Sequence, residues 1–502
     1  MKRLGFTLAL LCAATGLLAA AESERLPAAA KRNDAAAIRT FLERKGQVNE
    51  TAPDGTTALH WVAHWNDVES AGLLIRAGAT VKIVNHYGVT PLTLACTNGS
   101  AAMIDLLLKS GADPNTATPE GETVLMTASK TGKLDAVRLL LAAGAEVNRK
   151  EAWHGQTALM WAAAEGNLEV VERLVEQGAD KNARSDTGFT PLLFAVREGR
   201  MDVARFLIKS GANINEILPP RVRRKTGAGE ISGPEGNYSA LDLAVSNGHF
   251  ELAAMLLDEG ANPNAAGPGW TTLHTITWIR KPGTGTNDPA PEGKGNMDSL
   301  EIVRTLAAQG ANLNARMTKR TNFGSSALNM VGATPFLMAA RTGDAELMRL
   351  LAKLGADTSL TTDEKTTPLM AAAGVGTRSP GEDAGTETEA LEAVKAALEL
   401  GGDVNAVDAR GETAMHGTAY KQMPAVAQFL LDHGAKIGIW NQKNQYGWTP
   451  LRIAAGVHRT GNFRTTEPTA AVFRTAMEAE GISTVVEPEG EPAVTVRPAY
   501  KE

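Results

Sequence analysis

The chain has 502 residues, of which 43% are hydrophobic and 21% are charged, and its formal net charge is −6. An acidic chain lacks the positive charge that binds phosphate groups, so we expect neither nucleic acid nor an anionic membrane surface as a partner. A chain of this length usually contains several domains. An internal repeat changes that expectation, because stacked repeats add length without building a second core.

The N-terminal segment up to Ala21 has the pattern of a secretory signal peptide. Lys2 and Arg3 precede an uncharged run from Leu4 to Ala20. This run is short for a membrane span, and the alanines around Ala21 suit cleavage by a signal peptidase. We expect cleavage after Ala21, export to the periplasm or the cell exterior, and no integral membrane segment afterwards. A short membrane anchor is the alternative interpretation.

The mature chain would retain a single cysteine, Cys96, because Cys12 lies within the signal segment. No internal disulfide can then form. Cys96 stands where a helix pair needs a small side chain, which favours a packed thiol over a nucleophile. An exported chain without disulfides favours a bacterial envelope over a eukaryotic secretory route.

A repeat of about 33 residues runs through most of the chain. Each copy has a serine or threonine after a glycine turn, and we call this residue the anchor. Five of the ten steps between successive anchors are 33 or 34 residues long. The anchors are Thr57, Thr90, Thr123, Thr157, Thr190, Ser239, Thr271, Thr334, Thr367, Thr413 and Thr449. A weaker copy upstream has its register position at Glu24.

The copy from Gly188 to Asn215 predicts a pair of helices. Thr190 is placed to cap the first helix, and Pro191 suits its first position. Apolar residues recur at helical spacing on both sides of Gly199, and Gly211 ends the second helix. One such pair cannot bury its own apolar face, so its stability depends on neighbouring copies.

These segments resemble the ankyrin repeat, whose signature is GxTPLHxAA followed by LLxxGADxN. The first part recurs as GVTPLTLAC at 88–96, GATPFLMAA at 332–340 and GWTPLRIAA at 447–455. The second part recurs as LLKSGADPN at 107–115 and LLDEGANPN at 256–264. The resemblance covers roughly residues 24–480. It implies an all-α solenoid of about twelve helix-turn-helix repeats with projecting finger loops.

Breaks in the repeat define the expected organisation. Residues 22–215 form a regular array, 216–235 a loop insertion, 236–480 a second array, and 481–502 a flexible tail. The second array contains insertions at 281–297, 316–331, 374–387 and 456–468. Insertions in repeat arrays often map to a binding face, and they also occur as tolerated surface loops. Both interpretations stay open.

The resemblance also implies where a partner would bind. Ankyrin repeats contact partners through the fingers, the residue before the anchor, and two positions after the small-residue pair of the first helix. These positions are normally exposed in such repeats, and here they hold His64, Trp65, Tyr87, Trp153, Phe189, Tyr238, Trp270, Trp278, Tyr420 and Trp448. Trp61 and Trp161 fall on core positions. Packing of Trp270 and Trp278 against the neighbouring insertion is the alternative for that pair.

The sequence predicts no catalytic residues, no cofactor and no metal. His60, His274 and His416 occupy the histidine position of the signature, where the side chain bonds to neighbouring backbone. His60 and His64 have a spacing that suits a metal, but no third ligand accompanies them. Nucleophile elbows, zinc-protease motifs and phosphate loops are absent from the sequence.

We therefore expect a monomeric, non-catalytic scaffold that binds a protein partner. Two alternatives remain. The chain is a secreted effector that binds host or competitor proteins, or it is an enzyme whose pocket lies beneath the C-terminal insertions.

Overall fold

The computed structural model describes residues 25–218, 237–282, 291, 295–319, 328–377, 384–456 and 467–486. The chain divides into two compact units, Met1–Ile214 (unit 1) and Asn215–Glu502 (unit 2). Within the described residues every regular element is a helix, and only isolated bridges such as Thr51–Thr57 and Ala117–Thr123 interrupt this pattern. The predicted all-α repeat solenoid is confirmed.

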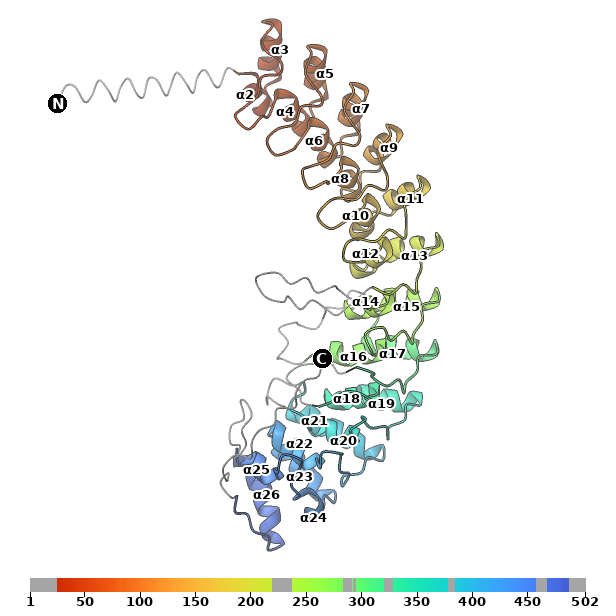
Figure 1. Cartoon of the computed structure of the whole chain (residues 1–502), viewed down its shortest axis with the longest axis vertical. Helices are drawn as coiled ribbons and strands as arrows, with labels where there is room; N and C mark the ends of the chain where they lie inside the picture. Colours follow the sequence, from red (N-terminus) through yellow and green to blue (C-terminus); the bar gives the residue numbers. More distant parts are fainter. Residues whose placement is uncertain are drawn as a thin grey trace, which may run out of the picture. The chain divides into compact units, whose positions relative to one another are not determined.

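In unit 1, a first helix and a second helix alternate along the chain, and each row stacks on itself (Figure 1). The first helices are α2 (Leu26–Lys31), α4 (Ala58–Trp65), α6 (Pro91–Asn98), α8 (Val124–Lys130), α10 (Ala158–Glu165) and α12 (Pro191–Arg197). The second helices are α3 (Ala35–Glu43), α5 (Val68–Arg76), α7 (Ala101–Lys109), α9 (Leu134–Ala142), α11 (Leu168–Glu176) and α13 (Met201–Lys209).

Unit 2 repeats this alternation. Its first helices are α14 (Ala240–Ser246), α16 (Thr272–Arg280), α18 (Pro335–Arg341), α20 (Pro368–Ala372), α22 (Ala414–Lys421) and α25 (Pro450–Ala454). Its second helices are α15 (Phe250–Asp258), α17 (Ser299–Ala308), α19 (Ala345–Leu354), α21 (Glu387–Glu399), α23 (Pro424–Asp432) and α26 (Glu467–Ala479). A short helix, α24 (Ile437–Trp440), follows α23.

The anchor residues begin the first helices as predicted. Thr190 is the N-cap of α12, its hydroxyl accepts the Leu193 N–H (3.4 Å), and Pro191 is the first helical residue. Every other anchor from Thr57 to Thr449 likewise stands immediately before a first helix. The apolar face that follows is buried: Leu192 and Val196 on α12 are 1% and 0% exposed, and Leu207 on α13 is 0% exposed.

The three signature histidines connect neighbouring repeats, as the sequence predicts. His60 Nδ1 lies 2.8 Å from the Thr57 hydroxyl, and its Nε2 lies 3.0 Å from the carbonyl oxygen of Val89 in the next repeat. His274 and His416 make the corresponding contacts. Burial lowers the pKa of His60, and it lowers the pKa of both other imidazoles to about 4. These side chains are structural parts of the stack.

A recurrent asparagine makes a second connection between repeats. Asn148 Nδ2 donates to the carbonyl of Gly178 (3.0 Å), and the Asp180 N–H donates back to its Oδ1 (2.7 Å). The same pair of bonds to the next repeat is made by Asn49, Asn115, Asn215, Asn264 and Asn405. One amide therefore satisfies a backbone acceptor and a backbone donor of the following loop.

Several predicted segments lie outside the described residues. They are the signal peptide at 1–21, the insertion cores at 219–236, 283–290, 292–294, 320–327, 378–383 and 457–466, and the tail beyond 486. In the part of the chain that the structure describes, every helix is too short or too polar to span a bilayer.

We expect Asn148→Ala to lower the free energy of unfolding by about 1–2 kcal/mol, because two hydrogen bonds to the next repeat are lost. Urea denaturation followed by circular dichroism measures this change. Asn182→Ala is a matched control, since Asn182 occupies the same loop position one repeat later but uses only its backbone N–H, which donates to Asp180. Equal destabilisation by both substitutions would contradict a stabilising role for the amide bridge.

Candidate functional site

The loops that lead into the first helices of unit 1, here called fingers, stack on one another through their backbones. The His86 N–H donates to the Asp54 carbonyl (2.9 Å), and the Ala152 N–H donates to the Glu120 carbonyl (2.9 Å). The Asp186 N–H donates to the His154 carbonyl (2.8 Å). At the step from the second to the third finger, the corresponding residue is Pro119, which has no N–H to donate.

Glycine permits this close approach. At Gly121 the backbone has φ +85°, and a Cβ would lie 2.9 Å from the nitrogen of Ala152 in the next finger. A larger residue would be strained by this φ and would push the neighbouring finger away. The tips of the fingers are therefore held in a fixed row.

Four of the predicted contact residues are exposed in unit 1. The exposed fractions of Trp65, Tyr87 and Trp153 are 45%, 69% and 74%, and His64 is also exposed. Trp65 ends α4 beside the His64 ring, with centroids 4.7 Å apart. Trp153 is stacked on its neighbour His154 at 5.0 Å with 14° between the planes. The predicted exposure of these four side chains is confirmed.

Other aromatic residues of unit 1 are half-buried. Phe189 packs against Phe194 with centroids 5.2 Å apart, and the Arg197 guanidinium lies 5.2 Å from its ring. The prediction that Trp61 and Trp161 belong to the core is wrong, because both are only half-buried. Lysine side chains from the preceding repeat cover their rings instead: Lys31 Nζ lies 5.4 Å from Trp61, and Lys130 Nζ lies 4.9 Å from Trp161.

Trp270 is not exposed, in agreement with the alternative that it packs against an insertion, although the insertion is the one at 316–331 and not the neighbouring one at 281–297. Its side chain is 5% exposed and belongs to a hydrophobic cluster with Met317, Leu328 and Met330. These three residues flank the insertion core at 320–327, and backbone hydrogen bonds join Met317 to Ala333 (2.9 Å) and to Gly332 (2.8 Å). The ends of that insertion fold over the indole, which explains its burial.

The remaining candidates of unit 2 are also covered to different degrees. Trp278 and Tyr238 are partly buried against the Trp270 cluster, and Trp448 is half-buried. The expected exposure of Tyr420 is wrong, because this side chain is 7% exposed. Its hydroxyl donates to Glu412 Oε1 (3.0 Å), so burial is compensated by a hydrogen bond. Binding of a partner by these side chains remains a prediction.

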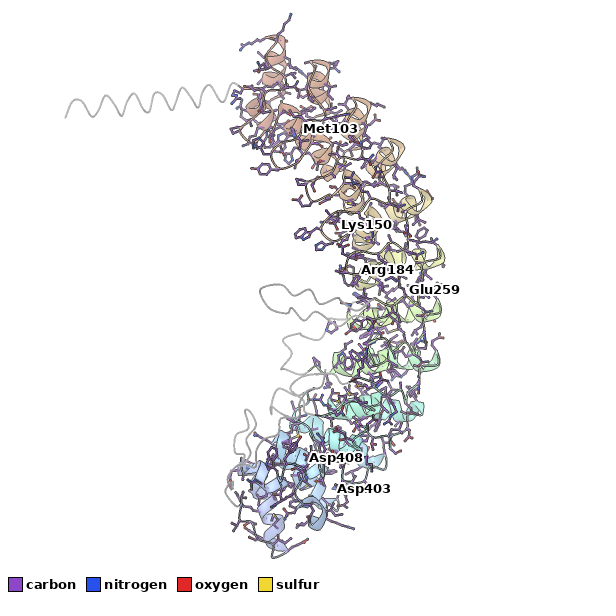
Figure 2. The ribbon with its side chains drawn as sticks, viewed as in Figure 1. Met103, Lys150, Arg184, Glu259, Asp403 and Asp408 are labelled. Atoms are coloured by element: carbon purple, nitrogen blue, oxygen red, sulfur yellow. The ribbon has the colours of Figure 1, made fainter. Side chains whose placement is uncertain are left out.

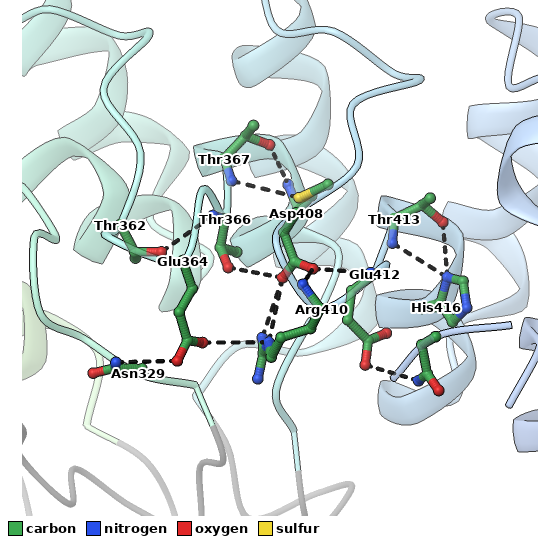
Figure 3. Close-up of polar contacts among 12 residues, drawn as sticks. Asn329, Thr362, Glu364, Thr366, Thr367, Asp408, Arg410, Glu412, Thr413 and His416 are labelled. Carbon is green, nitrogen blue, oxygen red and sulfur yellow. Dashed lines mark hydrogen bonds and ion pairs between the residues drawn. The ribbon is translucent and has the colours of Figure 1, made fainter. Parts of the chain in front are cut away.

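A buried ionic cluster in unit 2 was not predicted (Figure 3). Arg410, with a side chain 11% exposed, lies between two carboxylates: its Nε is 3.3 Å from Glu364 Oε2, and its Nη2 is 3.3 Å from Asp408 Oδ2. The Thr366 hydroxyl also donates to Asp408 (3.0 Å). A sequence signal exists, because acidic, basic and acidic residues alternate at 408, 410 and 412 directly before the anchor Thr413.

Glu412 is the least satisfied member of this cluster. Its Oε1 accepts hydrogen bonds from Tyr420 and from Asn444 Nδ2 (2.9 Å), but Oε2 is buried without a hydrogen-bond partner among the described residues. Burial raises the pKa of the carboxyl to about 7. The negative charge of Asp408 acts in the same direction, whereas Arg410 opposes it.

The described residues contain no group of three or more histidine, cysteine or acidic side chains placed to hold a metal ion. His60 cannot pair with His64 as a ligand, because both of its ring nitrogens already contact Thr57 and Val89. Cys96 is fully buried, and burial raises the pKa of its thiol well above the ordinary value.

Glu412 should make the protein less stable as the pH rises. Its folded-state pKa of about 7 exceeds the ordinary value of 4.5, so the folded state binds the proton more tightly. The stabilisation of the folded state by protonated Glu412 is fully present below pH 4.5 and is lost as the pH rises through 7. The loss in the free energy of unfolding is up to about 3 kcal/mol.

Denaturation midpoints of the wild type and Glu412→Gln at pH 5 and pH 8 measure this contribution. We expect the wild type to lose more stability than the variant, since the neutral amide does not titrate. Other buried groups, including Asp242 and His416, contribute to both proteins and cancel in the difference. An identical loss in the two proteins would rule out the assignment.

Comparison with known proteins agrees with this architecture. A family model described as ankyrin repeats (3 copies) matches residues 26–118, 125–217, 185–267 and 384–463, which together cover more than half of the chain. None of the curated proteins compared with the chain matches it. Ankyrin repeats generally mediate protein–protein interactions and are typically non-catalytic. The helix pairs, the capped anchors and the matched segments together show that the chain belongs to the ankyrin-repeat family.

Proposed function

We propose that unit 1 is a scaffold that binds a protein partner through its fingers and the ends of its first helices. One observation carries this proposal. Among the described residues of unit 1, the most exposed large apolar side chains are Trp65, Val84, Tyr87 and Trp153. All four lie on the end of a first helix or on a finger, and none lies on a second helix. Exposed tryptophan and tyrosine are the usual anchors of protein interfaces.

The surface is organised before a partner arrives. Glu151 is 6% exposed and its carboxylate accepts the backbone N–H groups of Trp153 (2.5 Å), His154 (2.9 Å) and Gln156 (2.9 Å). Burial raises the pKa of Glu151, but these backbone donors outweigh it and hold the pKa below the ordinary value. A finger fixed in this way loses little conformational entropy on binding, which favours affinity.

The double variant Trp65→Ala, Trp153→Ala should lose partner capture while its helicity and thermal midpoint stay close to those of the wild type, because exposed side chains contribute little to stability. Affinity capture from an envelope extract of the native source, read by mass spectrometry, measures the loss. Tyr446→Ala is a matched control, since Tyr446 is a finger aromatic of unit 2 that is 53% exposed. Retention of the same proteins by the double variant would exclude this face.

We also propose that the mature chain acts outside the cytoplasm, in the periplasm or beyond the cell. The N-terminal pattern of Lys2, Arg3 and the uncharged run supports this proposal. The mature protein should begin at Glu22, and its intact mass after cell fractionation tests that start. Retention in the envelope favours a resident scaffold, and release into the medium favours a secreted effector. A cytoplasmic protein that still begins at Met1 would refute export.

A further inference from the structure

The tips of the five stacked fingers of unit 1 alternate between two kinds of side chain. Carboxylates stand at Asp54, Glu120 and Asp186, and aromatic rings stand at Tyr87 and Trp153. Asp54, Tyr87 and Glu120 lie three residues before their anchors, and Trp153 and Asp186 lie four residues before theirs. We call these five residues the fingertip row. Backbone hydrogen bonds from His86, Ala152 and Asp186 join three of the four neighbouring pairs of fingers, and Pro119 has no N–H to donate at the remaining step. Successive fingers therefore carry a carboxylate and an aromatic ring in turn near their tips.

The carboxylates at two of these tips are available for a partner. Glu120 and Asp186 are exposed, and neither side chain makes a hydrogen bond or ion pair with another described residue. The Asp54 carboxylate accepts the Thr56 N–H (3.0 Å), which lowers the pKa of this group and keeps it ionised. Tyr87 and Trp153 are the two most exposed aromatic side chains among the described residues of unit 1.

The basic residues nearest to these tips direct their N–H groups to backbone carbonyls. Lys150 Nζ donates to the carbonyl of Arg184 (2.7 Å), and the Arg184 guanidinium donates to the carbonyl of Gly188 (3.2 Å). Both residues are labelled in Figure 2. Arg149 donates to the carbonyl of Asn115 (3.2 Å). Lys150 and Arg149 thus connect neighbouring loops, and Arg184 supports its own finger.

From this arrangement we infer that the fingertip row binds an extended segment of the partner that carries arginine side chains at regular intervals. The inference rests on the proposed function and specifies the partner's chemistry. A guanidinium forms charge-assisted hydrogen bonds with a carboxylate, and it also stacks favourably on the face of tryptophan or tyrosine. One type of side chain therefore satisfies both kinds of tip.

The spacing of the row sets the spacing of those arginines. Stacked helices lie about 8–10 Å apart, so successive fingertips are separated by a similar distance. A peptide in the polyproline II conformation advances about 3.1 Å per residue with three residues per turn, so every third side chain lies on the same face, about 9 Å from the previous one. An arginine at every third position of such a segment then faces each tip in turn.

The test uses the full chain and a fluorescein-labelled peptide that carries five arginines, one at every third position, separated by glycine and serine. Fluorescence anisotropy at pH 8 measures its affinity. A second peptide of the same composition carries its five arginines in one contiguous run, and a third replaces arginine with glutamine. We expect the spaced peptide to bind at least about fivefold more tightly than the contiguous one, and the glutamine peptide not to bind.

Two double variants and one single variant locate the site. Glu120→Gln with Asp186→Asn should weaken binding of the spaced peptide about fivefold to tenfold, and Trp153→Ala should weaken it to a similar extent. Glu169→Gln with Asp202→Asn removes the same charge from exposed positions on α11 and α13, away from the fingers, and should leave binding unchanged.

Three results would overturn the inference: no binding of the spaced peptide, equal binding of the spaced and contiguous peptides, or equal weakening by the two charge variants. The last two would indicate general attraction to an acidic protein. The proposed function is tested separately. If partner capture depends on Trp65 and Trp153 but not on Glu120 and Asp186, the scaffold stands and the arginine-bearing segment is wrong. If capture depends on neither pair, both are wrong.

Discussion

The fold depends on polar side chains that connect the backbone of one repeat to the backbone of the next. A single helix pair of this chain has a buried face on each side and cannot shield it alone. Hydrophobic contact brings neighbouring pairs together without fixing their spacing. The asparagine bridges and the histidine contacts supply that fixed spacing, because each pairs with backbone groups of the following repeat.

The same bridges explain why the sequence was so informative about the fold. Thr57 and His60 are three positions apart, and the contact between them is set within one helical turn. The other ring nitrogen contacts the carbonyl of the residue before the next anchor, which is Val89 for His60, Ala333 for His274 and Trp448 for His416. A recurring local pattern therefore predicted the helix starts, the buried faces and the structural role of the signature histidines. The exposure of Trp65, Tyr87 and Trp153 was predictable for the same reason.

The sequence predicted the surface of unit 2 less well, because burial there depends on segments that have no counterpart in the repeat. Trp270 occupies a position that is exposed in a regular array, and it is covered by Met317, Leu328 and Met330 from the ends of an insertion. Tyr420 is buried because Glu412 and Asn444 approach its hydroxyl from two different fingers. Neither contact follows from spacing within one repeat.

The residue before the anchor shows how the two units differ. In unit 1 this position holds Thr56, Val89, Glu122, Gln156 and Phe189, and the aromatic tips beside it remain exposed. In unit 2 it holds Tyr238, Trp270, Ala333, Thr366, Glu412 and Trp448, of which Trp270 and Glu412 are 5% and 2% exposed. Trp270 is covered by the ends of an insertion, and Glu412 accepts a hydrogen bond from Asn444 of the following finger. Unit 2 therefore uses its aromatic and acidic residues to stabilise its own loops, whereas unit 1 keeps Tyr87 and Trp153 on rigid fingers where a partner can reach them.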